Sequence, residues 1–262
     1  MTTVFVCGDL HCGHIAGLTP PGWRVNGGRY PGVHEMQARA WDAWLAMIAA
    51  VGPIDVAIVN GDLIDGPGQA SGGTEELTTD CVEQAEMAAA CLEPLRPTRG
   101  YAMTYGTAYH TGKGSDYEGI TARLLERQGV PVDIRSHQWV DVDGVVFDCK
   151  HHIGGSAVPH GRHTAIAKDR LWNLIWAEQG RQPKGGVVIR SHVHYHAYCG
   201  GPGWLAMTLP ALQQANTKYG ARRCSGTVDW GAVVFTIDNG EIVSWRPMIT
   251  QYLAAPSELL SL

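Results

Sequence analysis

The segment at residues 3–11 reads TVFVCGDLH, an apolar run that ends in a glycine, an aspartate and a histidine. Its composition and length predict a strand over 3–7 that runs straight into a turn at Gly8. A carboxylate and an imidazole two residues apart on such a turn can both reach one metal ion. We therefore expect the first strand to end in two metal ligands, Asp9 and His11.

The same arrangement recurs four times along the chain. Apolar strands are followed by GDLID at 61–65, by GTAYH at 106–110, by KHH at 150–152 and by SHVH at 191–194. Ligands in open α/β sheets gather beyond the carboxyl ends of strands, so we expect all five endings to meet in one crevice. Asp62 can then bridge two ions by giving one oxygen to each. Oxygen and nitrogen ligands without thiolate suit Mn, Fe or Zn.

The first half of the chain alternates strands with helices. We predict strands at 55–60, 101–105, 138–142, 145–149 and 187–190, and helices at 34–50, 75–93, 115–128 and 163–179. Residues 13–34, rich in Gly and Pro, are expected to form a long loop. Strand patterns at 203–209, 231–237 and 241–247 predict a β-meander at the end of the chain. Because no linker-like change in composition occurs, we expect one domain over 1–262.

Two of the predicted helices carry more specific expectations. Ser115 with Glu118 three residues later is the signature of a capping box at the start of helix 115–128. In helix 163–179 the apolar residues are expected to face the core. They are Ile166, Leu171, Leu174 and Ile175.

The composition bounds the partners and the compartment. A net charge of −5 gives no general attraction to nucleic acid. No run of about 18 apolar residues occurs, and the N-terminus does not resemble a signal peptide, so we expect no membrane span. Seven cysteines without a CxxC pair, with Cys7, Cys91 and Cys149 in apolar runs, predict buried thiols in a reducing cytoplasm.

Taken in order, the five blocks resemble the signature of the calcineurin-like metallophosphoesterase family. That signature runs D-x-H, GD-x-x-D, GNH-[DE], a lone His and GH-x-H, and the resemblance covers about residues 9–196. It implies an α/β fold, a four-layer α/β/β/α sandwich of mixed sheets, with two divalent metal ions at the strand ends. The residues that it assigns to the ions are Asp9, His11 and His194 for the first, Asp62 as the bridge, and His192 with His151 or His152 for the second. His151 is preferred because it follows the strand at 145–149 directly.

The block at 106–110 departs from the family pattern. Thr107 stands where the family has an Asn ligand, and it is a weaker neutral ligand for the second ion. His110 lies two residues later than the catalytic His of the family, and we predict that it protonates or stabilises the leaving oxygen. Asp65, at the end of GDLID, is expected to hold its turn rather than to bind metal.

The resemblance implies a dinuclear phosphoesterase, either phosphatase or phosphodiesterase, in which a metal-bound hydroxide attacks phosphorus in line, without a covalent enzyme intermediate. The expected substrate is a phosphate ester, a small molecule or nucleotide rather than a long nucleic acid. Two alternatives stay open: a DNA or RNA nuclease of the same family, and a catalytically degenerate metal-binding scaffold, which the altered GNH block favours. A metal-dependent amidohydrolase fits poorly, because it would carry His-x-His on its first strand. The oligomeric state is not predicted.

Overall fold

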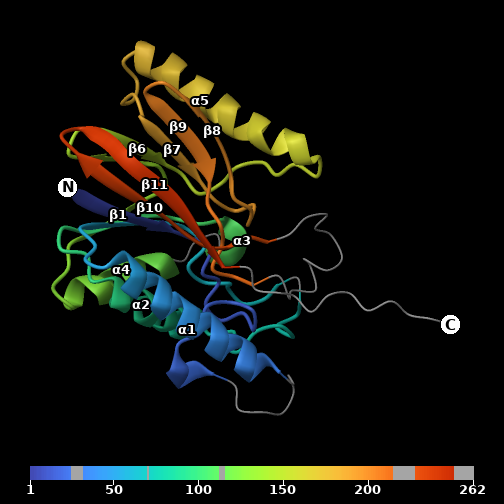
Figure 1. The fold of residues 1–262 in the computed structure, drawn as a ribbon. Coiled ribbons are helices and arrows are strands. Elements are labelled where there is room, and N and C mark those ends of the chain that lie inside the picture. Colours follow the sequence, from blue (N-terminus) through green and yellow to red (C-terminus); the bar gives the residue numbers. More distant parts are fainter. Residues whose placement is uncertain (25–31, 70, 112–115, 215–227, 251–262) are drawn as a thin grey trace.

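Two β-sheets lie face to face between layers of helices (Figure 1). The computed structural model describes residues 1–24, 32–69, 71–111, 116–214 and 228–250. Sheet 1 has six strands in the order β11-β10-β1-β2-β3-β4, and sheet 2 has five in the order β5-β6-β7-β9-β8. The strands of sheet 1 are β1 (Thr2–Cys7), β2 (Val56–Asn60), β3 (Gly100–Thr104), β4 (Val132–Arg135), β10 (Trp230–Asp238) and β11 (Glu241–Thr250). Those of sheet 2 are β5 (Gln138–Val142), β6 (Val145–Cys149), β7 (Val187–Arg190), β8 (Ala197–Gly201) and β9 (Trp204–Thr208).

Both sheets are mixed. In sheet 1 the strands β1 to β4 run parallel, and β10 pairs antiparallel with β1 and with β11. In sheet 2 the strands β6, β7 and β9 run parallel, and β5 and β8 are antiparallel edges. Parallel strands need crossover connections, and helices supply most of them here.

Helices form the two outer layers. On the outer face of sheet 1 lie α1 (Val33–Val51), α2 (Cys81–Leu92) and α4 (Tyr117–Arg127), and on that of sheet 2 lies α5 (Arg162–Glu178) (Figure 1). Short helical turns are η1 (Pro21–Trp23), η2 (Glu93–Leu95), α3 (Ala108–Thr111) and η3 (Pro159–Gly161). The predicted four-layer α/β/β/α sandwich is therefore confirmed.

Strand β1 shows how the side-chain alternation of a strand builds these layers. Phe5 and Cys7 pack with the helices of sheet 1, and the ring of Phe5 meets Trp44 of α1 edge-on at 5.6 Å. Val4 and Val6 point the other way, into the core between the two sheets. A strand buried on both faces needs an apolar residue at every position, and the uninterrupted run VFVC supplies it.

Several predicted elements begin or end elsewhere. Helix α2 begins at Cys81, because the Asp80 side chain accepts the N–H of Val82 at 2.8 Å and caps the helix there rather than near residue 75. Strands β4 and β8 were not predicted. The predicted β-meander is wrong: β8 and β9 belong to sheet 2, and β10 and β11 to sheet 1. Residues 25–31 of the predicted loop, and Ser115, lie outside the described residues.

The predicted core face of α5 is largely wrong. Ile166 is buried as expected, but Leu171, Leu174 and Ile175 are 56%, 36% and 36% exposed. The side of α5 that faces sheet 2 instead buries Arg170 and Asn173, which are held by hydrogen bonds.

The cysteines of the apolar runs and the lengths of the helices bear on two further predictions. Cys7, Cys91 and Cys149 are buried free thiols, as predicted, and burial raises the pKa of each. Within the described ranges, every helix is too short or too polar to cross a bilayer.

Candidate metal centre

Five strand endings meet at one edge of the sandwich. The strands β1, β2 and β3 are parallel in sheet 1, and β6 and β7 are parallel in sheet 2. Within sheet 1, Asp9 N–H donates to the carbonyl of Gly61 at 2.9 Å, and within sheet 2, Ser191 N–H donates to the carbonyl of His151 at 2.8 Å. Asn60 Nδ2 donates to Ser191 Oγ at 2.7 Å and so ties the two sheets together at this edge.

The backbone of these endings is left-handed at polar residues. Eight described non-glycine residues have positive φ, and five of them, with φ from 47° to 74°, are predicted ligands: Asp9, His11, Asp62, His192 and His194. Such conformations cost of order 1–3 kcal/mol each and persist only where the surrounding structure holds them. Strain concentrated at these positions points to a functional site.

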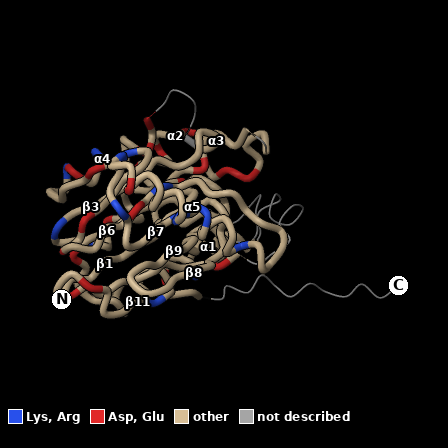
Figure 2. The backbone as a smooth tube through the Cα atoms, turned by 90° about the horizontal axis from the view of Figure 1, so that it is seen from above, with Lys and Arg blue, Asp and Glu red and all other residues tan. Residues whose placement is uncertain are grey.

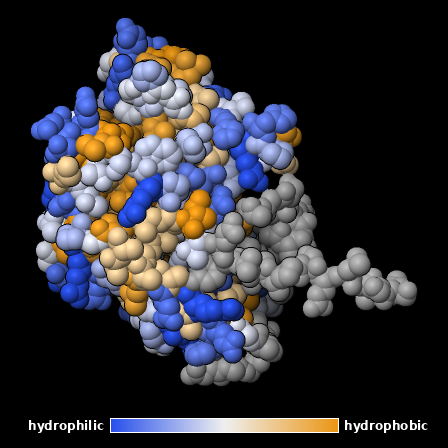
Figure 3. All heavy atoms as spheres, viewed as in Figure 1, coloured by the Kyte–Doolittle hydropathy of each residue, from blue (hydrophilic) through white to orange (hydrophobic). Residues whose placement is uncertain are grey.

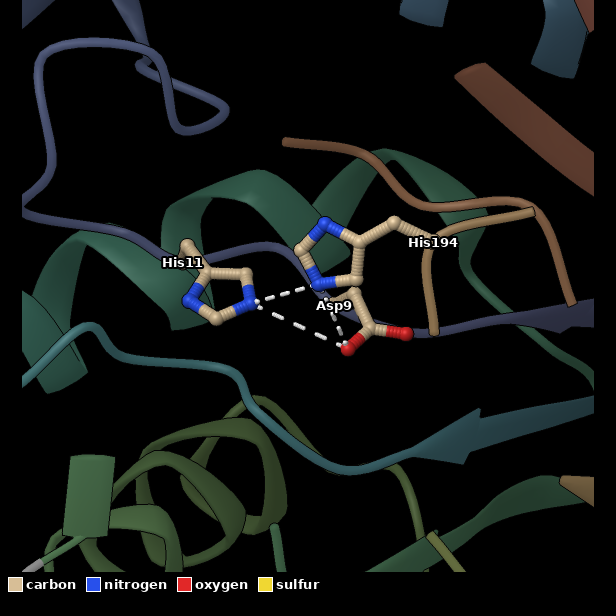
Figure 4. Close-up of side chains that lie close together, drawn as sticks. All are labelled: Asp9, His11 and His194. Carbon is tan, nitrogen blue, oxygen red and sulfur yellow. Dashed lines mark hydrogen bonds and ion pairs between the residues drawn. The ribbon is translucent and has the colours of Figure 1, made fainter. Parts of the chain in front are cut away.

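Asp9, His11 and His194 form the first cluster (Figure 4). Asp9 Oδ1 lies 3.2 Å from His194 Nε2 and 3.8 Å from His11 Nε2, and the two imidazole nitrogens are 3.2 Å apart. Ions with bonds of about 2.0–2.2 Å bring neighbouring ligand atoms to about 3 Å from one another, so these three atoms can share one ion. Asp9 Oδ1 is buried and has no hydrogen-bond partner in the part of the chain that is described.

Asp65 orients the first cluster. His11 Nδ1 donates to Asp65 Oδ1 at 2.8 Å, which leaves the lone pair of Nε2 facing Asp9 and His194. A carboxylate behind a metal-binding histidine fixes its ring and raises its basicity. Burial opposes the charge of His11, but the bond to Asp65 and the nearby carboxylates hold its pKa well above the usual value. A bound cation would take the place of that proton.

Asp62, His151 and His192 form the second cluster. Asp62 Oδ2 lies 2.9 Å from His151 Nε2 and 3.9 Å from His192 Nδ1. His151 Nδ1 donates to the carbonyl of Asn60 at 2.6 Å, so Nε2 is the free ring nitrogen. Although Nε2 is close to Asp62, it is not aligned as a hydrogen bond, and it is a buried atom with no such partner among the described residues. Burial lowers the pKa of His151, but Asp62 and Asp9 outweigh it and raise this pKa to about 9.

The two clusters adjoin each other through Asp9 and Asp62. His151 Nε2 of the second cluster lies 3.8 Å from Asp9 Oδ1 of the first. Asp62 also forms a group with His11 and His110, with all ligand atoms within 4.8 Å of one another. The structure thus brings together all six predicted ligands, whose roles as ligands stay predictions.

Asp62 presents its two oxygens to different partners. Oδ1 accepts the N–H of Thr107 at 2.6 Å and its hydroxyl at 3.2 Å, whereas Oδ2 faces the histidines. The expectation that Asp62 gives one oxygen to each ion stays a prediction. Thr107, expected as a ligand in place of Asn, is placed here as a hydrogen-bond donor that holds Asp62.

The two adjacent histidines after β6 have different surroundings. The ring of His151 is buried and belongs to the second cluster. The ring of His152 is exposed and tilts against the ring of His192, with 4.6 Å between the ring centres. Of the two histidines, His151 is therefore the one that lies in the second cluster, and its role as a ligand stays a prediction.

His110 stands beside both clusters. Its Nδ1 donates to the carbonyl of Asp65 at 2.8 Å, and its Nε2 lies 4.0 Å from Asp62 Oδ2. Burial, followed by the neighbouring His11, lowers the pKa of His110. The uncharged ring therefore presents a lone pair at Nε2, and the predicted donor role requires a proton at this atom. That role stays a prediction.

No known protein family and no curated protein matches the chain in sequence. Among solved structures it is similar to an archaeal phosphodiesterase, with 10% identity, a TM-score of 0.47, and coverage of 95% of this chain and 100% of that one. It is also similar to Vps29 complexed with Zn2+ from Entamoeba histolytica, with 13% identity, a TM-score of 0.43, and coverage of 95% and 98%. A predicted phosphoesterase from Streptococcus pneumoniae has 10% identity, a TM-score of 0.40, and coverage of 95% and 98%.

The fold agrees with the one that the sequence resemblance to calcineurin-like phosphoesterases implies. The layers, the mixed sheets and the strand-end Asp and His residues are those that the sequence resemblance implies.

Glu118 supports the site and was misjudged from the sequence. Its Oε1 accepts the N–H of Leu63 at 2.8 Å, and its Oε2 accepts the N–H of Gly106 at 2.7 Å, so it holds together the loops after β2 and β3. Burial, and then Asp62, raise the pKa of Glu118 to about 7. The predicted capping box is wrong, because Asp116 caps α4 by accepting the N–H of Gly119.

A further group of possible ligands, His14, Asp65 and Glu76, lies behind the first cluster. The N–H of Ala16 donates to His14 Nδ1 at 3.0 Å, so the hydrogen of the neutral ring is on Nε2. That nitrogen can donate to a carboxylate but cannot bind metal. We therefore interpret this group as support for Asp65, not as a third metal site.

Proposed function

We propose that the protein is a metal-dependent phosphoesterase that hydrolyses phosphomonoesters or phosphodiesters at a dinuclear centre. The observation that carries this proposal is the pair of buried atoms without hydrogen-bond partners among the described residues, Asp9 Oδ1 and His151 Nε2, 3.8 Å apart. Buried polar atoms are almost always paired, and two that face each other within adjoining Asp and His clusters fit cations between them.

The donor set fits two divalent ions. Asp9, His11 and His194 would hold the first, His151 and His192 would hold the second, and Asp62 would bridge them. The ions, when bound, would polarise the phosphoryl oxygens and lower the pKa of water. Carboxylate and imidazole ligands are compatible with Mn, Fe or Zn, and Mn2+ is our choice for a first assay.

The residues of the chain supply orientation and proton handling. Asp65 and the carbonyl of Asn60 fix the rings of His11 and His151 so that each turns its Nε2 inward. Thr107 holds the carboxylate of Asp62 in place. His110, anchored at Nδ1, would give a proton to the leaving oxygen once its Nε2 has been protonated.

A small phosphate ester or a nucleotide suits the site better than a long nucleic acid. Figure 2 shows Lys and Arg interspersed with Asp and Glu over the described chain, without a continuous basic stripe. Proteins that bind long nucleic acids neutralise many phosphates with such stripes.

The test is an assay of the purified, Mn2+-loaded protein on p-nitrophenyl phosphate and on bis-p-nitrophenyl phosphate. Turnover of at least one ester, abolished by chelation and restored by Mn2+, is expected, together with two ions per chain by elemental analysis. If tightly bound metal is present and neither ester is cleaved, the scaffold alternative holds instead. Cleavage of single- or double-stranded DNA at a comparable protein concentration would favour the nuclease.

A further inference from the structure

Helix α5 buries two polar residues beside Ile166 and exposes most of its large apolar residues. Its side toward sheet 2 buries Arg170 and Asn173, which are 5% and 2% exposed. Arg170 donates to Asn173 Oδ1 and to the carbonyl of Gly185, and Asn173 Nδ2 donates to Asp148 Oδ2 at 2.8 Å. Hydrogen bonds thus hold α5 on sheet 2 at positions where most helix–sheet interfaces have apolar contacts.

The apolar residues of α5 lie on its outer side. Five large side chains are between 36% and 56% exposed: Leu171, Trp172, Leu174, Ile175 and Trp176. The rings of Trp172 and Trp176 stack with 6.1 Å between their centres, and a hollow of about 540 Å³ lies along the C-terminal half of the helix. Figure 3 shows hydrophobic atoms exposed at the end of the molecule where α5 lies in Figure 1. A contiguous patch of this kind is typical of a docking surface.

The outer side of α5 also carries charges in register with the apolar residues. Lys168, Leu171, Ile175 and Glu178 follow one another at spacings of three, four and three residues, which is the a/d seam of a helix pair. All four are exposed, and neither Lys168 nor Glu178 forms an ion pair within the described ranges. The seam therefore has an apolar centre, a positive end and a negative end.

We infer that α5 docks against α5 of a second copy of this chain, antiparallel and about a two-fold axis near residue 173. In this arrangement Leu171 of each copy packs on Ile175 of the other, and Lys168 of each faces Glu178 of the other. The two Trp172 rings then lie on the same flank of the helix pair, close to the axis. The seam is complementary to itself only when antiparallel, because a parallel pair would place like charges together.

The size of the seam sets the strength of the dimer. A helix of 17 residues is about 25 Å long, so one helix face buries less than the roughly 800 Å² per partner of a standard interface. The dimer is therefore weak and depends on concentration. It lies apart from the strand-end edge and does not require bound metal.

The experiment is sedimentation velocity of the full chain over protein concentrations from about 1 µM to about 300 µM, where weak interfaces associate. We expect a monomer at the low end and a dimer at the high end. Leu171→Glu should weaken association at least about tenfold, as expected for a charge placed in the centre of the seam. The matched control is Val82→Glu, which changes an exposed apolar residue of α2 and should leave association unchanged.

A charge swap tests the antiparallel arrangement. Lys168→Glu and Glu178→Lys should each weaken the dimer, and the double variant Lys168→Glu/Glu178→Lys should restore it. A chain that stays monomeric at the highest concentration would overturn the inference. So would a dimer that Leu171→Glu leaves intact, or binding of this face to lipid vesicles without self-association.

Discussion

Replacing Asp62, the proposed bridging carboxylate, is the sharpest test of the proposed two-ion centre. In Asp62→Asn, the amide oxygen can still accept the N–H of Thr107, and the new NH2 group takes the place of Oδ2, which lies 2.9 Å from His151 Nε2. The hydrogen bonds from Thr107 are conserved, so the free energy of unfolding of the metal-free protein should change by less than about 2 kcal/mol.

Metal binding and turnover should respond quite differently. The amide cannot bridge two cations, and loss of several kcal/mol of transition-state stabilisation lowers the rate by about 10³-fold. Metal at about 100 times its Kd stabilises the wild-type fold by about 2.7 kcal/mol, a rise in Tm of about 5–10 °C for a chain of this size. The variant should lose most of this rise.

Three measurements decide the outcome: ester hydrolysis with Mn2+, Tm with and without Mn2+, and metal content per chain. Asp42→Asn, an exposed aspartate on α1, is the matched control and should behave as wild type. Near-normal turnover by a folded Asp62→Asn protein would refute the shared carboxylate.

Further predictions concern the groups around the site. Asp65→Ala should weaken binding of the first ion about 10- to 100-fold by releasing the His11 ring, measurable by metal titration; unchanged affinity would show that the ring needs no anchor. Thr107→Val should lower metal affinity by less than about tenfold, the value of one hydrogen bond, and a fall to one ion per chain would instead make the hydroxyl a ligand. Although burial raises the pKa of Asp148, hydrogen bonds from His137 and Arg190 hold it at about 2, below the value of 3.8 in the unfolded chain. Its contribution of about 2 kcal/mol is thus present above pH 4 and lost as the pH falls toward 2. The gap in stability between wild type and Asp148→Asn, measured by urea unfolding, should narrow over that range, and a constant gap would contradict the shift.

The site could be located from the sequence because its signals are local. Each strand ends in a glycine or turn that carries ligand-type residues within a few positions, so the order along the chain is enough to predict where the ligands gather. The preference for His151 over His152 followed from one such local fact, the end of β6.

What could not be predicted depends on distant partners. Glu118 accepts the N–H of Leu63, which lies 55 residues earlier in the chain. Since every residue except proline has a backbone N–H, the sequence does not show which one Glu118 will bind. The face of α5 was assigned wrongly because periodicity shows that a helix has an apolar side but not which side meets the sheet. Burying a polar side chain costs free energy unless it is hydrogen-bonded, and Arg170 and Asn173 have hydrogen-bond partners in the interior.

The left-handed backbone at five ligand positions also bears on how long the protein survives in a cell. At about 1 kcal/mol each, these conformations cost the metal-free fold about 5 kcal/mol, comparable with the whole net stability of an ordinary domain. The ions of the proposed centre, if they bind only the folded loops, would offset this cost. Proteases cleave the open form, so a cell short of metal would lose the protein itself as well as its activity. Pulse-chase half-lives in metal-replete and metal-depleted cells would measure this link.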